Sequence, residues 1–311
     1  MTGVEPPNIF DRSLAVRRRE RALARGSVPR FLLDRVADDL CDRLQFINRP
    51  FEDVLVLGGH DGSIGRRLRE LSRVRNVVET EASLRLAGML GLGAVVADEE
   101  ALPFGRETFD LVVAPLTLHT VNDLPGALVQ IRHVLRPDGL FLGAMAGGAT
   151  LQELRASWLQ AEADLLGGVS PRVAPFADVR DMGRLLQRAG FALPVADSDI
   201  VTVRYGTAFD LMSDIRAMGQ SNLLSERRRT PVTRGLLARA SEVYTEAFAQ
   251  ADGRVPATFE ILTLTAWAPH DSQPKPLKPG SATVSLAEAL GTRENSIPGS
   301  RTRSPDGADE S

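Results

Sequence analysis

Three glycines and a histidine follow a short apolar run and form the first candidate site. Residues 54–57 read Val-Leu-Val-Leu, and Gly58, Gly59 and Gly62 follow them, with His60 in between. Four consecutive apolar residues without polar alternation are typical of a strand buried on both faces of a parallel sheet. Glycines at the end of such a strand adopt positive φ angles and let the backbone approach a ligand. The pattern therefore predicts a nucleotide-binding turn.

Acidic residues follow the next two apolar runs along the chain. Glu79 comes after the apolar residues 77–78, and Asp98 and Glu99 come after the short run 93–97. An ionised carboxylate only accepts hydrogen bonds, which suits the hydroxyl groups of a ribose. The carboxyl ends of parallel strands meet at one edge of the sheet, where open α/β sheets bind ligands. These acids are therefore predicted to lie near the glycine turn, although each taken alone also fits a solvated loop acid.

Two nucleotide cofactors can be tested against this spacing. The nicotinamide motif Gly-x-Gly-x-x-Gly would use Gly62 and Gly65 as its last two glycines, but His60 then stands at the position of the first. S-adenosylmethionine needs a looser glycine turn, an acid at the end of the second strand and an acid after the third. Glu79, which is 17 residues after Gly62, and Asp98 meet these needs. The spacing favours S-adenosylmethionine.

His119 is the candidate catalytic residue, because it follows the fourth apolar run, residues 110–114. Both a general base and an ordinary loop histidine remain open for it. A metal site is not expected, because two histidines and a carboxylate do not occur at a recognisable spacing. The single cysteine, Cys41, excludes an intramolecular disulfide framework and a cysteine zinc cluster.

The elements that would position these residues alternate between strands and helices. Five strand-like runs with helices between them predict a doubly wound, mostly parallel α/β sheet. These strands are expected at 54–57, 76–80, 93–97, 110–114 and 140–145, and further strands at 200–205 and 259–267. Apolar residues at helical spacing predict helices at 28–46, after Gly62, and at 83–90, 124–135, 151–165, 178–189, from 207 and 230–248.

Capping and turn residues indicate where some of these helices begin or end. Gly190 is placed to end the helix that starts at Asp178, and Thr207 with Asp210 is a capping-box pair. Thr230, followed by proline, is expected to start the next helix. The turn at residues 136–139, Arg-Pro-Asp-Gly, is expected to separate a helix from the strand at 140–145.

Composition limits the class of protein. A net charge of −3 gives no basic footprint for nucleic acid, and no apolar run approaches the roughly 18 residues of a membrane span. Residues 1–30 are rich in arginine, which also occurs in mitochondrial presequences and membrane-surface helices. Asp11, Glu20 and the scarcity of large apolar residues favour a solvated helix that leads into the core. An interior compartment is expected.

Several segments resemble class I S-adenosylmethionine-dependent methyltransferases of the methyltransferase-11 kind. They are residues 97–104, 109–113, 118–125 and 135–139. More narrowly, the chain resembles the respiratory complex I assembly factors described as arginine hydroxylases, which occur in mitochondria and have relatives in alphaproteobacteria. The segments that resemble this family are residues 8–12, 143–148, 218–222, 255–258 and 280–284.

The resemblance implies a Rossmann-like methyltransferase domain at 49–269, after an N-terminal helical segment at 1–48. Helical insertions at about 149–177 and 206–252 would form a lid over the substrate, and a disordered tail is expected at 270–311. The cofactor implied is S-adenosyl-L-methionine. Its candidate contacts are Gly58, Gly59, Gly62, Glu79, Thr80, Asp98, Glu99 and Leu116.

The function implied is modification of a protein substrate, an arginine of a complex I subunit, in support of complex I assembly. The location would be the bacterial cytoplasm, or the mitochondrial matrix in a eukaryote, with peripheral membrane association allowed. Two alternatives remain open, a carboxyl O-methyltransferase of the malonyl-carrier-protein type and a non-catalytic assembly chaperone. The family normally has an acid at Val56, a glycine at His60 and an aromatic residue at Thr120, so cofactor affinity is the open question.

Overall fold

The computed structural model describes residues 8–26, 28–91 and 93–274 of the 311-residue chain. The chain divides into two units after Asp271, and all the helices and strands below belong to the first. Most of the tail expected at 270–311 lies outside the described residues, and so does the family-like segment 280–284.

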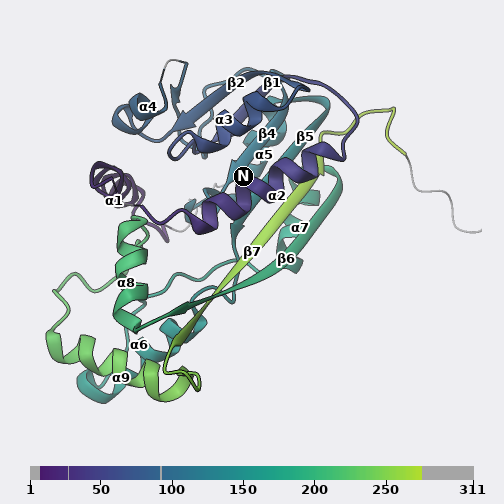
Figure 1. Cartoon of the computed structure of the whole chain (residues 1–311). Coiled ribbons are helices and arrows are strands. Elements are labelled where there is room, and N and C mark those ends of the chain that lie inside the picture. Colours follow the sequence, from purple (N-terminus) through teal and green to yellow (C-terminus); the bar gives the residue numbers. More distant parts are fainter. Residues whose placement is uncertain (1–7, 27, 92, 275–311) are drawn as a thin grey trace, which may run out of the picture. The chain divides into compact units, whose positions relative to one another are not determined.

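Seven strands of the described chain form one sheet (Figure 1). They are β1 (Phe51–Leu57), β2 (Val74–Glu81), β3 (Val95–Val96), β4 (Phe109–Pro115), β5 (Leu135–Ala146), β6 (Ala192–Tyr205) and β7 (Val255–Trp267). Their order is β3-β2-β1-β4-β5-β7-β6, in which β7 is antiparallel to both its neighbours and all other pairs are parallel. The strand order reverses between β1 and β4, and this switch point is where doubly wound sheets bind ligands. The predicted fold class is confirmed.

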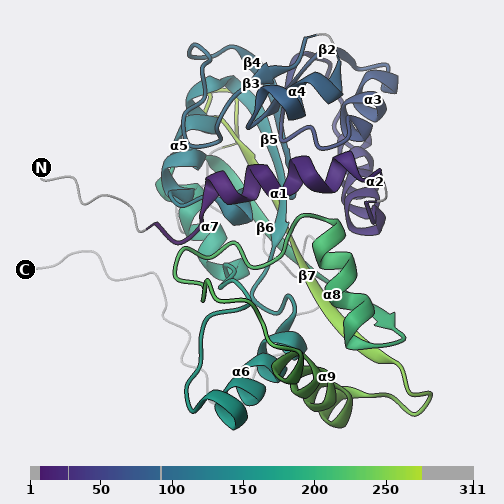
Figure 2. The ribbon, with the colours of Figure 1, turned by 90° about the vertical axis from the view of Figure 1, so that its left-hand side faces the viewer.

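Helices surround the sheet and extend past one end of it. They are α1 (Arg12–Ala24), α2 (Phe31–Gln45), α3 (Ser63–Glu70), α4 (Leu84–Leu90), α5 (Leu124–Val134), α6 (Gln152–Leu166), α7 (Val179–Arg188), α8 (Ala208–Ala217) and α9 (Arg234–Phe248), with a short 3₁₀ turn at Leu118–Thr120. Figure 2 shows α1 between the β1–β4 half of the sheet and α8.

The apolar run of β1 is buried on both faces, as the sequence predicts. Val54 and Val56 pack in a cluster with α2 and α3, whereas Leu55 and Leu57 pack in a second cluster with α5 and α7. Burying one such side chain contributes roughly 1.5–3 kcal/mol. The strand is thus held from both sides, and this fixes the position of the glycine turn at its end.

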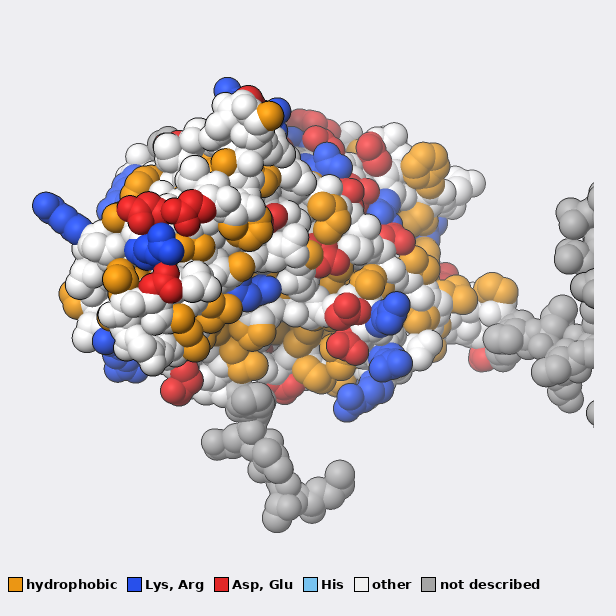
Figure 3. Space-filling view, turned by 90° about the horizontal axis from the view of Figure 1, so that it is seen from below, with side chains coloured by type: hydrophobic (Ala, Val, Ile, Leu, Met, Phe, Trp, Pro, Cys, Tyr) orange, Lys and Arg blue, Asp and Glu red, His pale blue; other side chains and the backbone are white. Residues whose placement is uncertain are grey.

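A third apolar cluster holds α6, α8 and α9 against the sheet. Helices α6, α8 and α9 pack around the far ends of β6 and β7, with Tyr244 fully buried at their centre. Figure 3 shows the face at this end of the described unit, where hydrophobic side chains lie between charged ones. On α6, Leu159, Leu165 and Leu166 are among the exposed hydrophobic residues.

Some predicted boundaries are confirmed and others move. The capping box of Thr207 and Asp210 is present, and Gly190 follows the end of α7 with a φ of 85°. Helix α9 begins after Thr233, whose hydroxyl accepts a hydrogen bond from the Leu236 N–H, so the predicted start at Thr230 was wrong. The proline that suggested that start precedes the cap.

The turn predicted at residues 136–139 is absorbed into a strand. Strand β5 already begins at Leu135, which pairs with Phe109, and the pairing shifts register before Leu111. Asp138 has a φ of 62°, so the Pro-Asp-Gly signal produces an irregularity within β5 and not a separate turn.

Candidate functional site

The glycine turn is held by the neighbouring strand. The Gly59 N–H donates to the Thr80 carbonyl at 2.9 Å, and the Thr80 hydroxyl donates to the Val56 carbonyl at 3.2 Å. Gly58 and Gly62 have φ angles of 72° and 74°. Thr80, one of the predicted contacts, is therefore the residue that fixes the turn at the end of β1.

His60 spans the switch point of the sheet. Its φ is 55°, its backbone N–H donates to Glu81 Oε1 at 2.7 Å, and its Nε2 lies 2.6 Å from the Pro115 carbonyl at the end of β4. Burial lowers the pKa of His60, and the nearby Arg19 lowers it further. The ring is thus neutral and donates from Nε2 to the carbonyl, which closes the crevice between β1 and β4 with a side chain.

The two acids of β2 occupy different places. Glu79 lies beneath the first turn of α3, where a Cβ at Gly65 would come within 2.2 Å of its carboxyl carbon. Its Oε2 pairs with Arg69 at 2.8 Å, while its buried Oε1 has no hydrogen-bond partner among the described residues. Glu81 is the last residue of β2, and its carboxylate lies beside the His60 N–H at the mouth of the turn. Sequence reasoning missed Glu81.

A second group of acids follows β3. Glu99 is buried and accepts a hydrogen bond from the Thr117 hydroxyl at 2.5 Å. Burial would raise the pKa of Glu99, but the Arg12 guanidinium and this hydroxyl outweigh burial and hold the pKa below its ordinary value. Asp98 is half exposed at the rim, and Leu116 lies beside both on a φ of 50°. The structure brings Asp98, Glu99 and Leu116, three of the predicted cofactor contacts, together in the wall of one cavity.

Two arginines of α1 form ion pairs with these acids. Arg19 Nη2 lies 2.5 Å from Glu81, whose side chain is fully shielded from solvent, and Arg12 pairs with Asp98 at 2.7 Å and with Glu99. Both arginine side chains are four-fifths buried or more. The prediction of a solvated N-terminal helix was therefore wrong for this face of α1, because its cations neutralise carboxylates of the sheet edge.

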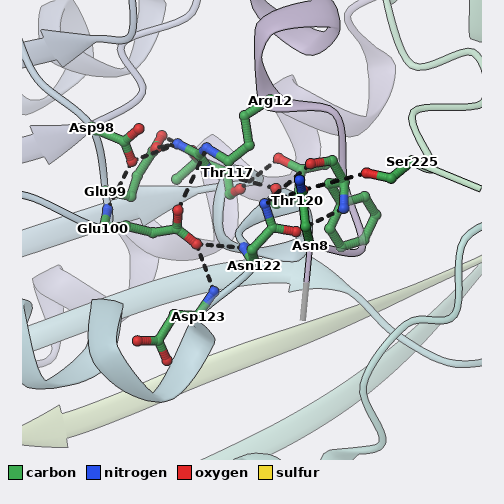
Figure 4. Close-up of polar contacts among 11 residues, drawn as sticks. Asn8, Arg12, Asp98, Glu99, Glu100, Thr117, Thr120, Asn122, Asp123 and Ser225 are labelled. Atoms are coloured by element: carbon green, nitrogen blue, oxygen red, sulfur yellow. Dashed lines mark hydrogen bonds and ion pairs between the residues drawn. The ribbon is translucent and has the colours of Figure 1, made fainter. Parts of the chain in front are cut away.

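Figure 4 shows how the chain before α1 is fixed to the same loop. The Phe10 N–H donates to Asn122 Oδ1 at 2.7 Å, and Asn122 Nδ2 donates to the Phe10 carbonyl at 3.1 Å. Glu100 accepts the backbone N–H groups of Asn122 and Asp123. Asp123 in turn caps α5 through the Gly126 N–H. The Val-Asn-Asp-Leu-Pro motif thus anchors the N-terminal segment and starts a helix.

The other family-like motif, residues 218–222, contacts α1 from the opposite side. A Cβ at Gly219 would lie 3.2 Å from backbone atoms of Arg18, and the φ of Gly219 is 76°, so this close approach favours glycine. The Arg18 guanidinium donates to the carbonyls of Ser221 and Asn222 at 2.7 Å each. Both motifs therefore position α1 over the acids.

Replacing Asn122 with alanine is expected to loosen α1. The variant loses both hydrogen bonds to Phe10, and at about 0.5–1.5 kcal/mol for each bond the free energy of unfolding should fall by about 1–2 kcal/mol. Urea denaturation measures the loss, and hydrogen exchange of α1 should accelerate. The exposed Asn48 serves as control, and N48A should change neither quantity. Equal behaviour of the two variants would contradict this role of Asn122.

Two cavities adjoin the turn. The smaller, of about 220 Å³, lies under α1 among Arg12, Arg19, Asp98, Glu99 and Leu116. The larger, of about 580 Å³, lies between the sheet edge and the helical insertions. Of the residues that contribute to both walls, three follow β1 or β4, namely His60, Leu116 and Thr120. Neither Glu79 nor Glu81 is among the residues that line the two cavities.

His119 lines the larger cavity. Its ring packs edge-on against Phe176 at 5.9 Å between centroids, and its buried Nδ1 has no hydrogen-bond partner in the described part of the chain. Burial, helped by the nearby His60 and Arg19, lowers the pKa of His119 to about 4. The imidazole is therefore neutral at pH 7, able to accept a proton but weakly basic.

The shifted pKa of His119 predicts a pH dependence of stability. Its folded pKa, about 4, lies below the ordinary 6.5, so the unfolded chain binds the proton more readily. The stabilising contribution is complete above about pH 6.5 and is lost as the pH falls toward 4. Between pH 7 and pH 5 the wild-type protein should lose roughly 2 kcal/mol more than His119→Gln. Urea titrations at the two pH values measure this, and H133Q, at an exposed histidine, should keep the wild-type slope.

In residues 8–26, 28–91 and 93–274, no three His, Cys, Asp or Glu side chains are grouped so that they could hold a metal ion. No helix in these ranges is long and apolar enough to span a membrane.

Comparison with known proteins defines the class. Residues 62–143 match the family model Methyltransf_11, a methyltransferase domain. A Bacillus halodurans protein assigned as a methyltransferase superposes with a TM-score of 0.54 at 17% identity, covering 75% of this chain and 98% of its own. The YcgJ protein of Bacillus subtilis gives 0.53 at 14% identity, covering 76% and 99%. The fold is that of the class I methyltransferase superfamily.

Relatives with higher identity narrow this class to a family. Arginine-hydroxylase NDUFAF5, mitochondrial, from Danio rerio is 42% identical over 90% of this chain and 89% of its own length. The Homo sapiens protein of that name is 40% identical over 94% and 86%. A malonyl-[acyl-carrier protein] O-methyltransferase from Halorhodospira halophila is 35% identical over 75% and 79%. The chain belongs to the family of arginine-hydroxylase NDUFAF5, which confirms the resemblance found in the sequence.

Proposed function

We propose that the smaller cavity binds S-adenosylmethionine. The donor set fits an adenosine, because the carboxylates of Asp98 and Glu99 line the cavity and accept amino hydrogens, and Leu116 offers an apolar surface. Arg19 also lines the cavity and pairs with Glu81 at the end of β2, so displacement of Arg19 would expose that carboxylate to the ribose hydroxyls. Glu81 takes the ribose role that the sequence suggested for Glu79, since its carboxylate lies at the mouth of the turn. Of the glycine turn, His60 lines the cavity, and the flanking Gly58, Gly59 and Gly62 are the residues that would let the backbone approach the cofactor. We assign Asp98 and Glu99 to the adenine end of the cofactor.

Three residues limit access to this cavity, namely Arg12, Arg19 and His60. Arg12 and Arg19 hold the carboxylates that the nucleoside needs, so both guanidinium groups leave when the cofactor enters. The His60 ring stands in the crevice between β1 and β4.

When bound, the cofactor supplies an electrophilic methyl group on a sulfonium. The protein positions the acceptor beside it, and His119 in the adjoining wall is the candidate to hold a proton.

We infer that the substrate is an arginine side chain of another protein, a subunit of respiratory complex I, and that the protein supports complex I assembly. One observation carries this inference, the identity of 40% or more to arginine-hydroxylase NDUFAF5 over at least 90% of the chain. Peripheral association with a membrane fits such a partner. The bacterial cytoplasm, or the mitochondrial matrix in a eukaryote, is the corresponding location.

The test separates the function classes in two steps. Calorimetric titration with S-adenosylmethionine up to millimolar concentration comes first, and binding is expected. Absence of binding would contradict both enzyme functions and leave an assembly chaperone. Co-expression with a complex I subunit follows, with mass analysis of its arginine peptides. A gain of one oxygen indicates hydroxylation, a gain of one methylene indicates methyl transfer, and methylation of a malonyl carrier protein instead would replace the arginine substrate.

A further inference from the structure

Helix α1 presents a line of arginines to solvent, on the side of the helix opposite Arg12 and Arg19. Arg17, Arg21 and Arg25 are exposed and follow one another at intervals of four residues. Side chains at this spacing share one face of a helix, and at 1.5 Å of rise per residue they are about 6 Å apart. Within the described part of the chain, none of the three side chains has an ion pair or a hydrogen bond. We call them the outer arginines.

Contacts that involve no carboxylate of the cofactor cavity hold α1 in place. The Arg18 guanidinium donates to two carbonyls of residues 218–222 at 2.7 Å each, and Gly219 lies against the Arg18 backbone. Before the helix, Asn122 binds the Phe10 backbone. These contacts fix the backbone from which the outer arginines project, across the near side of the molecule in Figure 2. A partner that binds them therefore loses less free energy to ordering.

The acids of this segment are already engaged. Asp11 pairs with Arg227 at 3.0 Å and caps α1, and Glu20 accepts a hydrogen bond from a serine hydroxyl at 2.7 Å. Burial lowers the pKa of Arg18, and the charges of Arg227 and Arg21 lower it further. Like charges at a spacing of four residues also repel one another along the helix. The charge that remains on the outer face of α1 is positive, although the whole chain carries a net charge of −3.

The spacing of the outer arginines fits an extended acidic peptide. A guanidinium binds a carboxylate through two parallel hydrogen bonds. In an extended chain every second side chain points to the same side, about 6.7 Å from the next, which is close to the spacing on α1. The exposed face of α1 has no large apolar or aromatic side chain, which a membrane surface or a single-stranded nucleic acid would contact. Acidic residues at alternate positions of a protein segment are therefore the best match.

We propose that the outer arginines bind an acidic, extended segment of the protein that carries the acceptor arginine. This inference rests on the proposed function, which makes the substrate a protein. Residues of α1 line the cofactor cavity, and Phe10, just before the helix, lines the larger one. A segment bound along α1 thus lies beside both cavities, and its arginine can enter the larger one while its carboxylates remain on the helix surface.

Two labelled peptides test the proposal by fluorescence anisotropy with the full chain at low salt. One alternates Ser and Glu, and the other alternates Ser and Gln. The glutamate peptide is expected to bind at least about tenfold more tightly, and the triple variant R17Q/R21Q/R25Q should lose at least about tenfold of that affinity. The variant R85Q/R106Q/R188Q is the matched control, because it removes an equal charge from exposed arginines elsewhere. It should change the affinity less than about twofold, since distant charges are screened.

An equal loss in the two triple variants, or no preference for the glutamate peptide, would overturn the proposal. Phosphatidylglycerol vesicles are the second ligand, and if only their binding depended on the outer arginines, a membrane would replace the protein segment. Glutamine is a good helix former, and circular dichroism verifies the fold of both variants. The outer arginines do not line the cofactor cavity, so a titration with S-adenosylmethionine tells a failure of the proposed function from a failure at this surface.

Discussion

Replacing Arg19 with glutamine is expected to raise the affinity for S-adenosylmethionine at least about tenfold, a gain of about 1.4 kcal/mol. In the wild-type protein Arg19 holds Glu81 at 2.5 Å, on the oxygen atoms that we assign to the ribose. The cofactor must therefore displace a cation from a carboxylate that is shielded from solvent. Glutamine retains a hydrogen-bond donor but no charge, so it competes less strongly. Calorimetric titration of both proteins measures the difference.

The same substitution is expected to destabilise the protein without ligand. Glu81 would be a buried carboxylate without its cation, and breaking such a pair costs about 3–5 kcal/mol. The free energy of unfolding should fall in that range, and added S-adenosylmethionine should restore part of it. R17Q is the matched control, because Arg17 is exposed on the same helix and makes no ion pair with the described residues. Weaker cofactor binding by R19Q would instead show that Arg19 contacts the cofactor.

Because Arg19 lowers the affinity for the cofactor and stabilises the protein without ligand, α1 has a structural role at this edge of the sheet. The carboxylates of Glu81, Asp98 and Glu99 lie at one edge of the sheet, and they repel one another unless cations lie close to them. Arg12 and Arg19, two turns apart on one helix face, supply them before any nucleoside arrives. The edge is thereby held in its final shape, at the expense of free access to its carboxylates.

Sequence reasoning predicted the sheet well, because its signals are local. The run at residues 54–57 is apolar at every position, and its short length and the glycines that follow it favour a strand covered on both faces over a buried helix. Glu79 and Glu81 could not be told apart in the same way. They are two residues apart and point to the same side of β2, so the choice depends on where the strand ends, and the predicted end was one residue short.

The roles of α1 and of the larger cavity depend on contacts between distant segments. Arg19 meets a residue 62 positions along the chain, and nothing in its neighbourhood distinguishes it from the exposed Arg17. The cavity wall likewise combines Leu32, Leu154 and Leu237, each of which has the periodicity of an ordinary core residue. Such sites become visible only when tertiary packing is known.

Replacing His60 with glycine is expected to have the second large effect on the cofactor. The ring fills the crevice between β1 and β4 and donates to the Pro115 carbonyl at 2.6 Å, so its removal opens the switch point. A non-glycine residue at a φ of 55° costs roughly 1–2 kcal/mol, and glycine removes this strain. Loss of the hydrogen bond offsets about 1 kcal/mol of that gain. Stability should therefore change little, while affinity for S-adenosylmethionine rises about tenfold or more in calorimetric titration.

The control for this variant is Glu107→Gly, because Glu107 also has a left-handed backbone, with a φ of 53°, in an exposed turn that lines neither cavity. It should gain stability from the same relief of strain and leave cofactor affinity unchanged. If H60G bound S-adenosylmethionine no better than E107G, the ring would not be the obstacle. If H60G bound S-adenosylmethionine less tightly, the imidazole would be a contact of the cofactor. The histidine that replaces the family's glycine would then take part in cofactor binding and would not obstruct it.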